Sequence, residues 1–251
     1  MDLQLKGKNA IVTGGSKGIG RSIALNLAEE GANVAICARG EDALKRTEKE
    51  LLEKGVKIIA LPCDVGDDKQ LDDFLEKVKD QLGTIDILVN NVSALSLGDE
   101  DSDWQSSINV DLLGSVRGTR KVIPWMMEAG SGSILFISSI SGLEAGSPPA
   151  YAAAKAALIS YSKTIAVQLA PKNIRVNTLS PGSIEFPGGL WEQTKTHNPA
   201  FYEMALNSIP SGRLGTPDEV GKVATFMVSP AASWLVGTCL NVDGGQHKAN
   251  L

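Results

Sequence analysis

The sequence predicts an α/β fold, a doubly wound parallel sheet of seven strands with helices on both faces. Short apolar runs alternate with amphipathic segments from one end of the chain to the other, as they do where strands are joined by crossover helices. The 26 glycines are more than a helical bundle needs and favour many strand-to-helix turns. A chain of 251 residues, 43% of them hydrophobic, is long enough for one domain over residues 1–251.

Seven apolar runs are the predicted strands, and they cover residues 10–13, 33–38, 57–61, 85–90, 133–138, 175–179 and 239–242. The helical period is clearest between the third and fourth of these strands, at Leu71, Phe74, Leu75, Val78 and Leu82. Such a stripe faces a sheet, and the charged residues between its members face solvent. Neither a repeat nor a linker interrupts the pattern, so the strands are expected to form one sheet.

Residues 183–209 break the alternation of strand and helix. An irregular connection of this length is uncommon within a domain and is usually a lid or a binding loop. The segment carries large apolar side chains, among them Phe186 and Trp191. We therefore expect a flap over a substrate site, although the same side chains could instead pack the flap onto the core or onto a neighbouring subunit.

Composition excludes several classes of function. A net charge of -5 and a pI of about 5.2 leave no basic surface for nucleic acid or an anionic membrane. No apolar stretch approaches the roughly 20 residues that span a bilayer, and the first residues do not resemble a signal peptide. The three cysteines are far apart and lack metal-ligand spacing, so we expect reduced buried thiols, no metal and a cytoplasmic protein.

A glycine-rich turn follows the first predicted strand and precedes a helix. Residues 14–20 read G-x-x-x-G-x-G, and glycine lets a pyrophosphate approach the backbone N–H groups at the positive end of a helix dipole. The spacing differs from the G-x-G-x-x-G form of many dinucleotide-binding folds, so alone it could be an ordinary turn. Its place between strand and helix predicts a Rossmann-type cofactor site, with contacts from Gly14, Ser16, Lys17, Gly18, Ile19 and Gly20.

The end of the second strand distinguishes NAD from NADP. A carboxylate at this position bonds the ribose 2′-hydroxyl and repels a 2′-phosphate. Here the sequence has Ala38 and Arg39, and the guanidinium of Arg39 can bind a phosphate through two N–H groups while Lys17 adds a second cation. The sequence therefore predicts NADP(H) as the cofactor, unless both residues are only solvated surface charges.

Tyr151 and Lys155 are four residues apart in a segment rich in helix formers, so their side chains share one face of a helix. A nearby ammonium stabilises a phenolate, which lets a tyrosine act as a general acid and base near neutral pH. The same spacing is also common on amphipathic helices without catalytic function. Ser138 ends the fifth strand and places a hydroxyl at the carboxyl edge of the sheet, where ligands bind, which favours the catalytic interpretation.

Together these motifs resemble the short-chain dehydrogenase/reductase family, in its form with Thr-Gly-x-x-x-Gly-Ile-Gly and Tyr-x-x-x-Lys. The similarity extends from Gly7 to Gly245, and its overall layout is similar to 3-oxoacyl-[acyl-carrier-protein] reductases. The resemblance implies an oxidoreductase that interconverts a ketone and a secondary alcohol. Further matching motifs are Cys63-Asp64-Val65, Asn90-Asn91, Asn109-Val110, Pro181-Gly182, Arg213-Leu214-Gly215 with Pro217 and Glu219, and residues 241–245.

The resemblance also implies a role for each matching position. Tyr151 would exchange a proton with the reacting oxygen, and Lys155 would support the tyrosine and hold the nicotinamide ribose. Ser138 would hydrogen-bond the reacting oxygen, and Asn109 would hold a water that relays the proton to solvent. The other implied cofactor contacts are Asp64 and Val65 at the adenine, and Asn91, Ile184 and the backbone after Pro181 and Gly182 at the nicotinamide.

Two departures from the family pattern bear on the substrate. After Asn90-Asn91 the family usually has Ala-Gly, and the bulkier pair found here narrows the space beside the nicotinamide. After Pro181-Gly182 a threonine of the family is absent. The sequence indicates a small to medium, largely apolar carbonyl or alcohol, cyclic or aromatic, and the predicted substrate contacts are Ser138, Val92, Ser93, Phe186 and Trp191.

Two other functions stay open. The first is reduction of a 3-oxoacyl thioester on acyl carrier protein, which is acidic, but residues 128–133 lack the basic residues that such reductases place there. The second, a non-catalytic NADP(H)-binding protein, predicts loss of catalytic residues that are in fact present. Family members commonly form tetramers, so the resemblance also implies a homotetramer built on the long central helices and the C-terminal strand.

Overall fold

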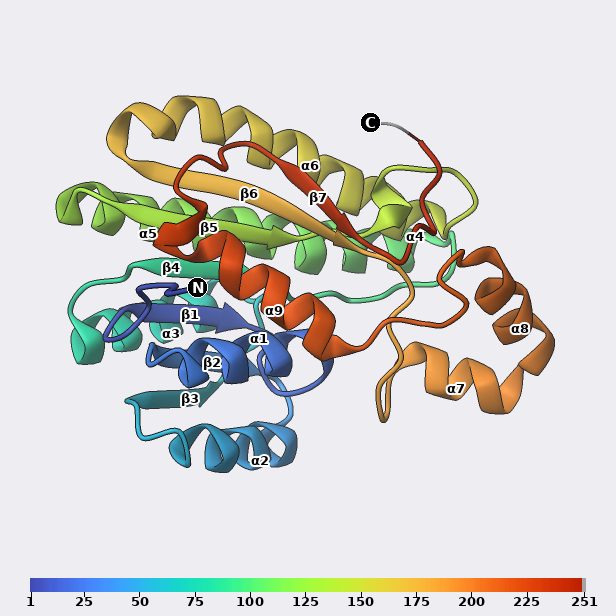
Figure 1. The fold of residues 1–251 in the computed structure, drawn as a ribbon, viewed down its shortest axis with the longest axis horizontal. Helices are drawn as coiled ribbons and strands as arrows, with labels where there is room; N and C mark the ends of the chain where they lie inside the picture. The colour runs from blue at the N-terminus through green and yellow to red at the C-terminus, as the bar shows by residue number, and fades with distance from the viewer. Residues whose placement is uncertain (250–251) are drawn as a thin grey trace.

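The computed structural model describes residues 1–249 and contains the predicted seven-stranded parallel sheet, in the order β3-β2-β1-β4-β5-β6-β7 (Figure 1). Every strand pair in this order is parallel. The fold class expected from the alternating pattern is thus confirmed. The strands are β1 (Asn9–Thr13), β2 (Asn33–Ala38), β3 (Ile58–Pro62), β4 (Ile87–Asn90), β5 (Gly132–Ile137), β6 (Ile174–Pro181) and β7 (Cys239–Val242).

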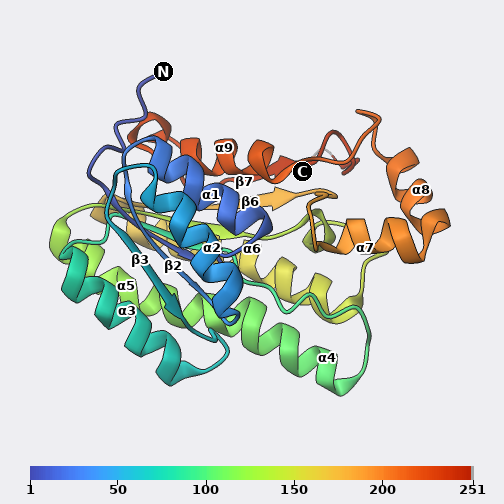
Figure 2. The same ribbon diagram turned by 90° about the horizontal axis from the view of Figure 1, so that it is seen from below.

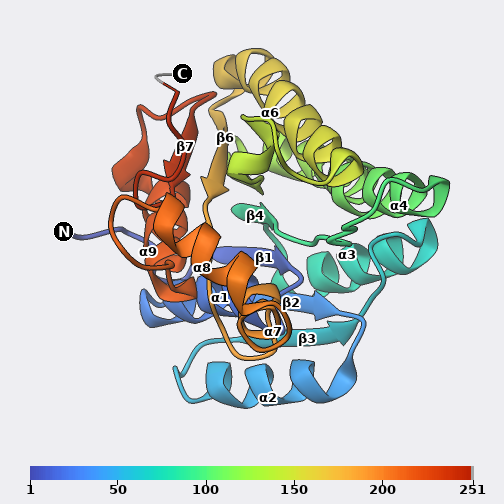
Figure 3. The same cartoon turned by 90° about the vertical axis from the view of Figure 1, so that its right-hand side faces the viewer.

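Helices cover both faces of the sheet, as Figures 2 and 3 show. One apolar core lies between the sheet and α1 (Gly18–Glu29), α2 (Glu41–Leu52) and α9 (Pro217–Val228). A second core lies between the other face and α3 (Asp68–Leu82), α5 (Ser115–Ala129) and α6 (Pro149–Leu169). Neighbouring residues of β1 point into different cores, Val12 into the first and Ile11 into the second, as strand geometry requires.

Three further parts of the chain matter for the site. The helix α4 (Asp101–Ser106) continues through a π-helical segment, η1 (Ser107–Gly114), directly into α5. A single turn, η2 (Ile140–Gly142), lies between β5 and α6.

None of the described helices has the length and apolar composition that crossing a membrane requires.

The predicted irregular segment, residues 183–209, is mostly helical, which corrects the sequence interpretation. It forms α7 (Leu190–His197) and α8 (Pro199–Ser208), and Asn198 caps α8 by accepting a hydrogen bond from the N–H of Phe201. Both helices are short and only weakly amphipathic, so their pattern is hard to recognise in sequence. They lie beyond the carboxyl ends of the strands, at the right of Figure 1.

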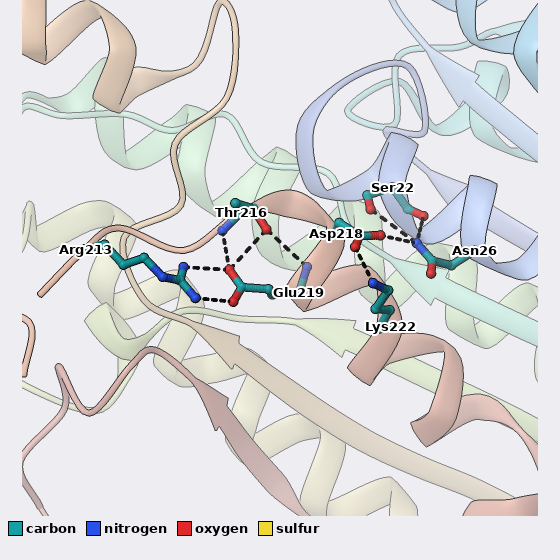
Figure 4. Close-up of polar contacts among 7 residues, drawn as sticks. All are labelled: Ser22, Asn26, Arg213, Thr216, Asp218, Glu219 and Lys222. Atoms are coloured by element: carbon teal, nitrogen blue, oxygen red, sulfur yellow. Dashed lines mark hydrogen bonds and ion pairs between the residues drawn. The ribbon is translucent and has the colours of Figure 1, made fainter. Parts of the chain in front are cut away.

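The start of α9 is fixed to the rest of the chain by the cluster drawn in Figure 4. Thr216 and Glu219 form a capping box, and the guanidinium of Arg213 donates to both carboxylate oxygens of Glu219. Asn26 of α1 donates to Asp218 over 3.2 Å. The helices approach closely at Gly221, where an added Cβ would lie 2.6 Å from Ser22 Oγ.

Candidate active site

The carboxyl ends of all seven strands meet at one edge of the sheet because every pair is parallel. Chain order reverses direction at β1, whose neighbours are β2 and β4. Open α/β sheets bind ligands in the crevice at such a switch point. The side chain of Asn91, just after β4, spans it: Nδ2 donates to the carbonyls of Thr13, over 3.0 Å, and Gly14, over 3.2 Å.

The glycine turn between β1 and α1 is folded so tightly that only glycine fits at its key positions. A Cβ on Gly20 would lie 2.3 Å from the carbonyl oxygen of Gly14, and one on Gly15 would lie 2.5 Å from Ile36. Gly14 itself has φ of +68°. The turn therefore leaves open backbone at the start of α1, where N–H groups can receive a phosphate.

The other predicted contacts of this turn have supporting roles. The carbonyl of Ser16 accepts a hydrogen bond from Thr47 of α2, over 2.9 Å, which ties the turn to α2. Ile19 packs against the first core, between the sheet and the helices α1, α2 and α9. Lys17 and Arg39 are exposed and form no ion pair within residues 1–249, so both are free to meet an anion at this edge. Ala38, the last residue of β2, is half-buried beside them.

The residues expected at the adenine lie after β3. Asp64 Oδ1 accepts from the N–H of Gly66 over 2.9 Å, and Val65 is buried. Asn109 braces the same turn, because its Nδ2 donates to the carbonyl of Gly66 over 2.9 Å. Arg117 in turn donates to Asn109 Oδ1 over 2.9 Å. The structure thus places Asn109 against the turn after β3, where the adenine contacts are expected.

Tyr151 and Lys155 lie on one face of α6, as their spacing predicts. Lys155 Nζ lies 5.6 Å from the centroid of the Tyr151 ring. The lysine is only 2% exposed, and Nζ donates to the carbonyl of Ile137 over 3.1 Å. The Tyr151 hydroxyl forms no hydrogen bond within the described chain, so it can meet an incoming oxygen, while the lysine is held by the strand behind it.

Two serines follow β5, and their hydroxyls are used differently. Ser138 Oγ donates to the backbone carbonyl of Lys155 over 2.8 Å. Ser139 Oγ instead accepts from the N–H of Ser141 over 3.1 Å at the start of η2. A hydroxyl carries a single hydrogen to donate. That hydrogen is committed in Ser138 and uncommitted in Ser139, a residue that the sequence interpretation passed over.

Asp111, and not the predicted catalytic residue Asn109, lies beside Lys155. Its Oδ1 lies 3.2 Å from Lys155 Nζ, and its side chain is fully buried. Residues two apart on a helix point to nearly opposite sides, so Asn109 and Asp111 cannot serve the same site. A lone acid within an apolar helical run, together with a lysine that needs a counter-ion, was the signal in sequence for Asp111.

The turn after β6 is held by the C-terminal segment. Gln246 Oε1 accepts from the N–H of Ser183 over 2.9 Å, and a Cβ on Gly182 would meet Asp243 at 2.7 Å. His247 Nδ1 lies 2.9 Å from Glu144 in the loop that leads to α6. The backbone after the buried Pro181 is thereby fixed at the same edge as Tyr151. Ile184, also buried, forms a parallel bridge with Gly215.

The predicted substrate contacts separate into three groups. Phe186 packs against the glycine turn, since a Cβ on Gly18 would lie 2.6 Å from its ring. Trp191 stacks with Phe201 of α8, with ring centroids 5.9 Å apart. Val92 lies against Gly14, with 3.1 Å between Cγ2 and an added Cβ, and Ser93 Oγ accepts from the N–H of Leu95. Phe186 and Trp191 therefore have different packing partners.

Tyr202 of α8 adds a polar group to the flap. Its hydroxyl donates to Glu185 over 2.8 Å, and Lys195 lies 3.5 Å from the same carboxylate. Its bond to that carboxylate raises the pKa of Tyr202. The flap is thus braced internally by an aromatic stack and a small polar cluster.

The arrangement matches known proteins along nearly the whole chain. A family model described as enoyl-(acyl carrier protein) reductase matches residues 14–247. The 3-oxoacyl-[acyl-carrier-protein] reductase of Thermotoga maritima is 37% identical over 249 residues, 97% of this chain and 99% of that protein.

Two solved structures bear on the cofactor. L-Sorbose reductase from Gluconobacter frateurii, complexed with NADPH and L-sorbose, matches with a TM-score of 0.90 and 34% identity, over 99% of this chain and 100% of that chain. An NAD⁺-bound xylitol dehydrogenase matches with a TM-score of 0.90 and 30% identity, over 96% of this chain and 100% of that chain. Similar structures therefore carry either nicotinamide cofactor.

Proposed function

The chain belongs to the short-chain dehydrogenase/reductase family of oxidoreductases, which bind a nicotinamide cofactor, and on that premise we propose that it interconverts a ketone and a secondary alcohol with NADP(H). Tyr151 is the general acid and base of this proposal. The observation that carries it is the buried ammonium of Lys155, 5.6 Å from the Tyr151 ring, at the edge where the glycine turn begins α1. That the protein is an oxidoreductase of this family does not depend on which substrate it uses.

The residues present fit a dinucleotide. The glycine turn provides backbone N–H groups at a helix start, and its Cβ positions are closed by neighbouring side chains and, at Gly20, by the carbonyl of Gly14. The turn would hold the pyrophosphate, Asp64 and Val65 the adenine, and Lys155 with the backbone after Pro181 the nicotinamide half. When bound, the cofactor donates or accepts the hydride, and the protein supplies orientation and the proton.

The protein's own part is proton delivery. In the reductive direction Tyr151 gives its hydroxyl proton to the carbonyl oxygen, and in the oxidative direction its phenolate takes the alcohol proton. Lys155 stabilises the phenolate by its positive charge. A serine hydroxyl holds the reacting oxygen in line with Tyr151. The free hydrogen of Ser139 makes this residue the better donor, with Ser138 as the alternative expected from the sequence.

NADP(H) is favoured over NAD(H) by charge at the end of β2. Arg39 and Lys17 are exposed cations without an ion-pair partner among residues 1–249, and the sequence has no carboxylate where a 2′-hydroxyl would be bound. The L-sorbose reductase structure contains NADPH, which agrees with this proposal, whereas the xylitol dehydrogenase structure contains NAD⁺.

The proposed substrate is a small to medium, largely apolar ketone or alcohol. Val92 and Ser93 add bulk beside the site, and the flap contributes aromatic surface at Trp191. Reduction of a 3-oxoacyl thioester is the second candidate, and the identity to the Thermotoga maritima reductase favours it. Residues 128–133 carry no basic side chain for an acidic carrier protein, which argues against it.

A substrate screen tests the proposal. The oxidation or formation of NADPH is followed by absorbance with cyclic ketones, aromatic diketones, sugars, steroids and a 3-oxoacyl thioester analogue. Tyr151→Phe should lower kcat by about 100-fold or more. Tyr161→Phe, the same change ten residues later on α6, should leave the rate unchanged. No turnover with any carbonyl compound, or equal activity in Tyr151→Phe, contradicts the proposal; faster turnover of the thioester supports the second candidate.

A further inference from the structure

A fully buried carboxylate lies beside the lysine of the proposed catalytic pair. Asp111, in η1, has no exposed side-chain surface, and its Oδ1 lies 3.2 Å from Lys155 Nζ, itself 2% exposed. An unpaired charge so deep in a protein is strongly unfavourable, so the two groups must compensate each other. The proton transfer proposed for Tyr151 and Lys155 does not use this acid.

The hydrogen bonds around the pair identify its charge state. Asp111 Oδ2 accepts from the N–H of Ala94 over 2.9 Å, while Oδ1 faces the ammonium and accepts no hydrogen bond within the described chain. A protonated carboxyl group would need an acceptor for its own hydrogen. No described atom accepts a hydrogen bond from either oxygen. The surroundings therefore fit a carboxylate opposite an ammonium.

Other charged groups of the neighbouring elements are engaged elsewhere. On α5, Arg117 pairs with Asp68, and Arg120 lies near Tyr161. On α4, Asp101 is exposed and Asp103 belongs to a capping box.

The helix α6, which packs against η1, carries three titratable groups that bear on Asp111: Tyr151, Lys155 and Lys163. Lys163 donates to the carbonyl of Gly237, far from η1 along the chain. Lys155 and Tyr151 are the titratable groups that the described contacts bring to this side of Asp111.

We propose that Asp111 is the buried counter-ion of Lys155 and a positioning residue for the reaction. Its carboxylate holds the ammonium against the carbonyl of Ile137, beneath the ring of Tyr151, and links it to the loop after β4 through Ala94. By offsetting part of the lysine charge, Asp111 weakens the electrostatic support that Lys155 gives to the phenolate of Tyr151. The catalytic consequence rests on the proposed function; the ion pair does not.

A double-mutant cycle in thermal melting tests the ion pair without any substrate. Lys155→Met leaves the Asp111 carboxylate buried and unpaired, so the Tm at pH 8 should fall by on the order of 10 °C. Adding Asp111→Asn removes that charge, and the double variant should recover at least half of the loss. A double variant that does not fold, or melts no higher than Lys155→Met, overturns the proposal.

A pH profile tests the catalytic consequence. In the alcohol-oxidation direction, Asp111→Asn should move the midpoint of the kcat/KM profile to lower pH by about one unit. Asp101→Asn, the same change on the exposed start of the continuous helix, should leave the midpoint in place. An unchanged or raised midpoint in Asp111→Asn overturns the positioning role. If no alcohol is oxidised, the proposed function fails, while the melting cycle still decides the ion pair.

Discussion

The hydroxyl of Ser138 donates a hydrogen bond to the backbone carbonyl of Lys155 over 2.8 Å. This contact joins the end of β5 to the helix that carries Tyr151 and Lys155. It uses the one hydrogen that the Ser138 hydroxyl can donate, whereas the hydroxyl of Ser139 accepts a hydrogen bond and keeps its hydrogen. The two neighbouring serines are thus expected to differ in function.

Ser139→Ala should lower kcat about 100-fold, because an oriented donor to the reacting oxygen is lost. Ser138→Ala should instead lower the Tm by about 2–6 °C, since it removes a buried hydrogen bond between β5 and α6. Steady-state kinetics and thermal melting of both variants separate the two roles. A larger kcat loss in Ser138→Ala than in Ser139→Ala would return the role to the residue that the sequence interpretation favoured.

Arg39→Asp should reverse the cofactor preference. The substitution replaces an exposed cation with a carboxylate, which repels a 2′-phosphate and can accept a hydrogen bond from a 2′-hydroxyl. We expect the ratio of kcat/KM for NADPH to that for NADH to fall about 100-fold, or roughly 2.7 kcal/mol. Arg46→Asp, on the next helix, is the matched charge change. An unmodified protein that prefers NADH rules out the NADP(H) proposal.

Glu219→Gln should make the free energy of unfolding fall less steeply as the pH is lowered. The bonds from Arg213 and Thr216 lower the pKa of Glu219 from its ordinary value of 4.5 to about 2. A lowered folded-state pKa stabilises the protein above pH 4.5, and this contribution is lost as the pH falls toward 2. Since Glu219 is 42% exposed, solvent screens the pair and about 1 kcal/mol is expected at pH 7.

Denaturant unfolding at pH 7 and at pH 3 measures this effect. The difference between the unmodified protein and Glu219→Gln should shrink at pH 3. Glu203→Gln, on α8, removes an exposed carboxylate that forms no ion pair within residues 1–249 and should give equal differences at both pH values. A Glu219→Gln difference that does not change with pH would show that the carboxylate charge contributes nothing.

Gly221→Ala should destabilise the contact between α1 and α9. The added methyl group would lie 2.6 Å from Ser22 Oγ, 2.9 Å from Asn26 Nδ2 and 3.1 Å from the Ser22 carbonyl carbon, so both side chains must shift and the helix backbones must move slightly apart. Overpacking of this kind costs about 1–3 kcal/mol, or a Tm lower by roughly 2–12 °C. Gly40→Ala, where nothing lies within 4 Å, is the control. Equal Tm values in the two variants would contradict the close approach.

The sheet and its edge could be predicted from the sequence because they depend on patterns of whole segments. The predicted boundaries of β2 and β7 match the structure, while β4 begins at Ile87 rather than at residue 85. Which of two nearby residues faces a site depends on helical phase, and the π-helical segment η1 changes that phase. Asn109 and Asp111 could therefore not be distinguished by motif spacing alone.

A homotetramer is expected only from family resemblance, and light scattering of the purified protein checks it.

The short helices α7 and α8 were missed because two turns of weakly amphipathic sequence give little periodic signal. Trp191 lies on α7, so its stacking with Phe201 of α8 could not be foreseen from sequence, and its contact with substrate stays a prediction.

Phe186→Ala should weaken cofactor binding more than substrate binding. The Phe186 ring packs against Gly18, the first residue of α1, whose N–H is expected to meet the pyrophosphate. Without the ring, this helix start is more open to water, and we expect KM for NADPH to rise about tenfold, or roughly 1.4 kcal/mol. Trp191→Ala, which truncates an aromatic ring that stacks on Phe201 within the flap, should leave that KM unchanged. A change in substrate preference at constant KM for NADPH would instead place Phe186 in the substrate site, as the sequence first suggested.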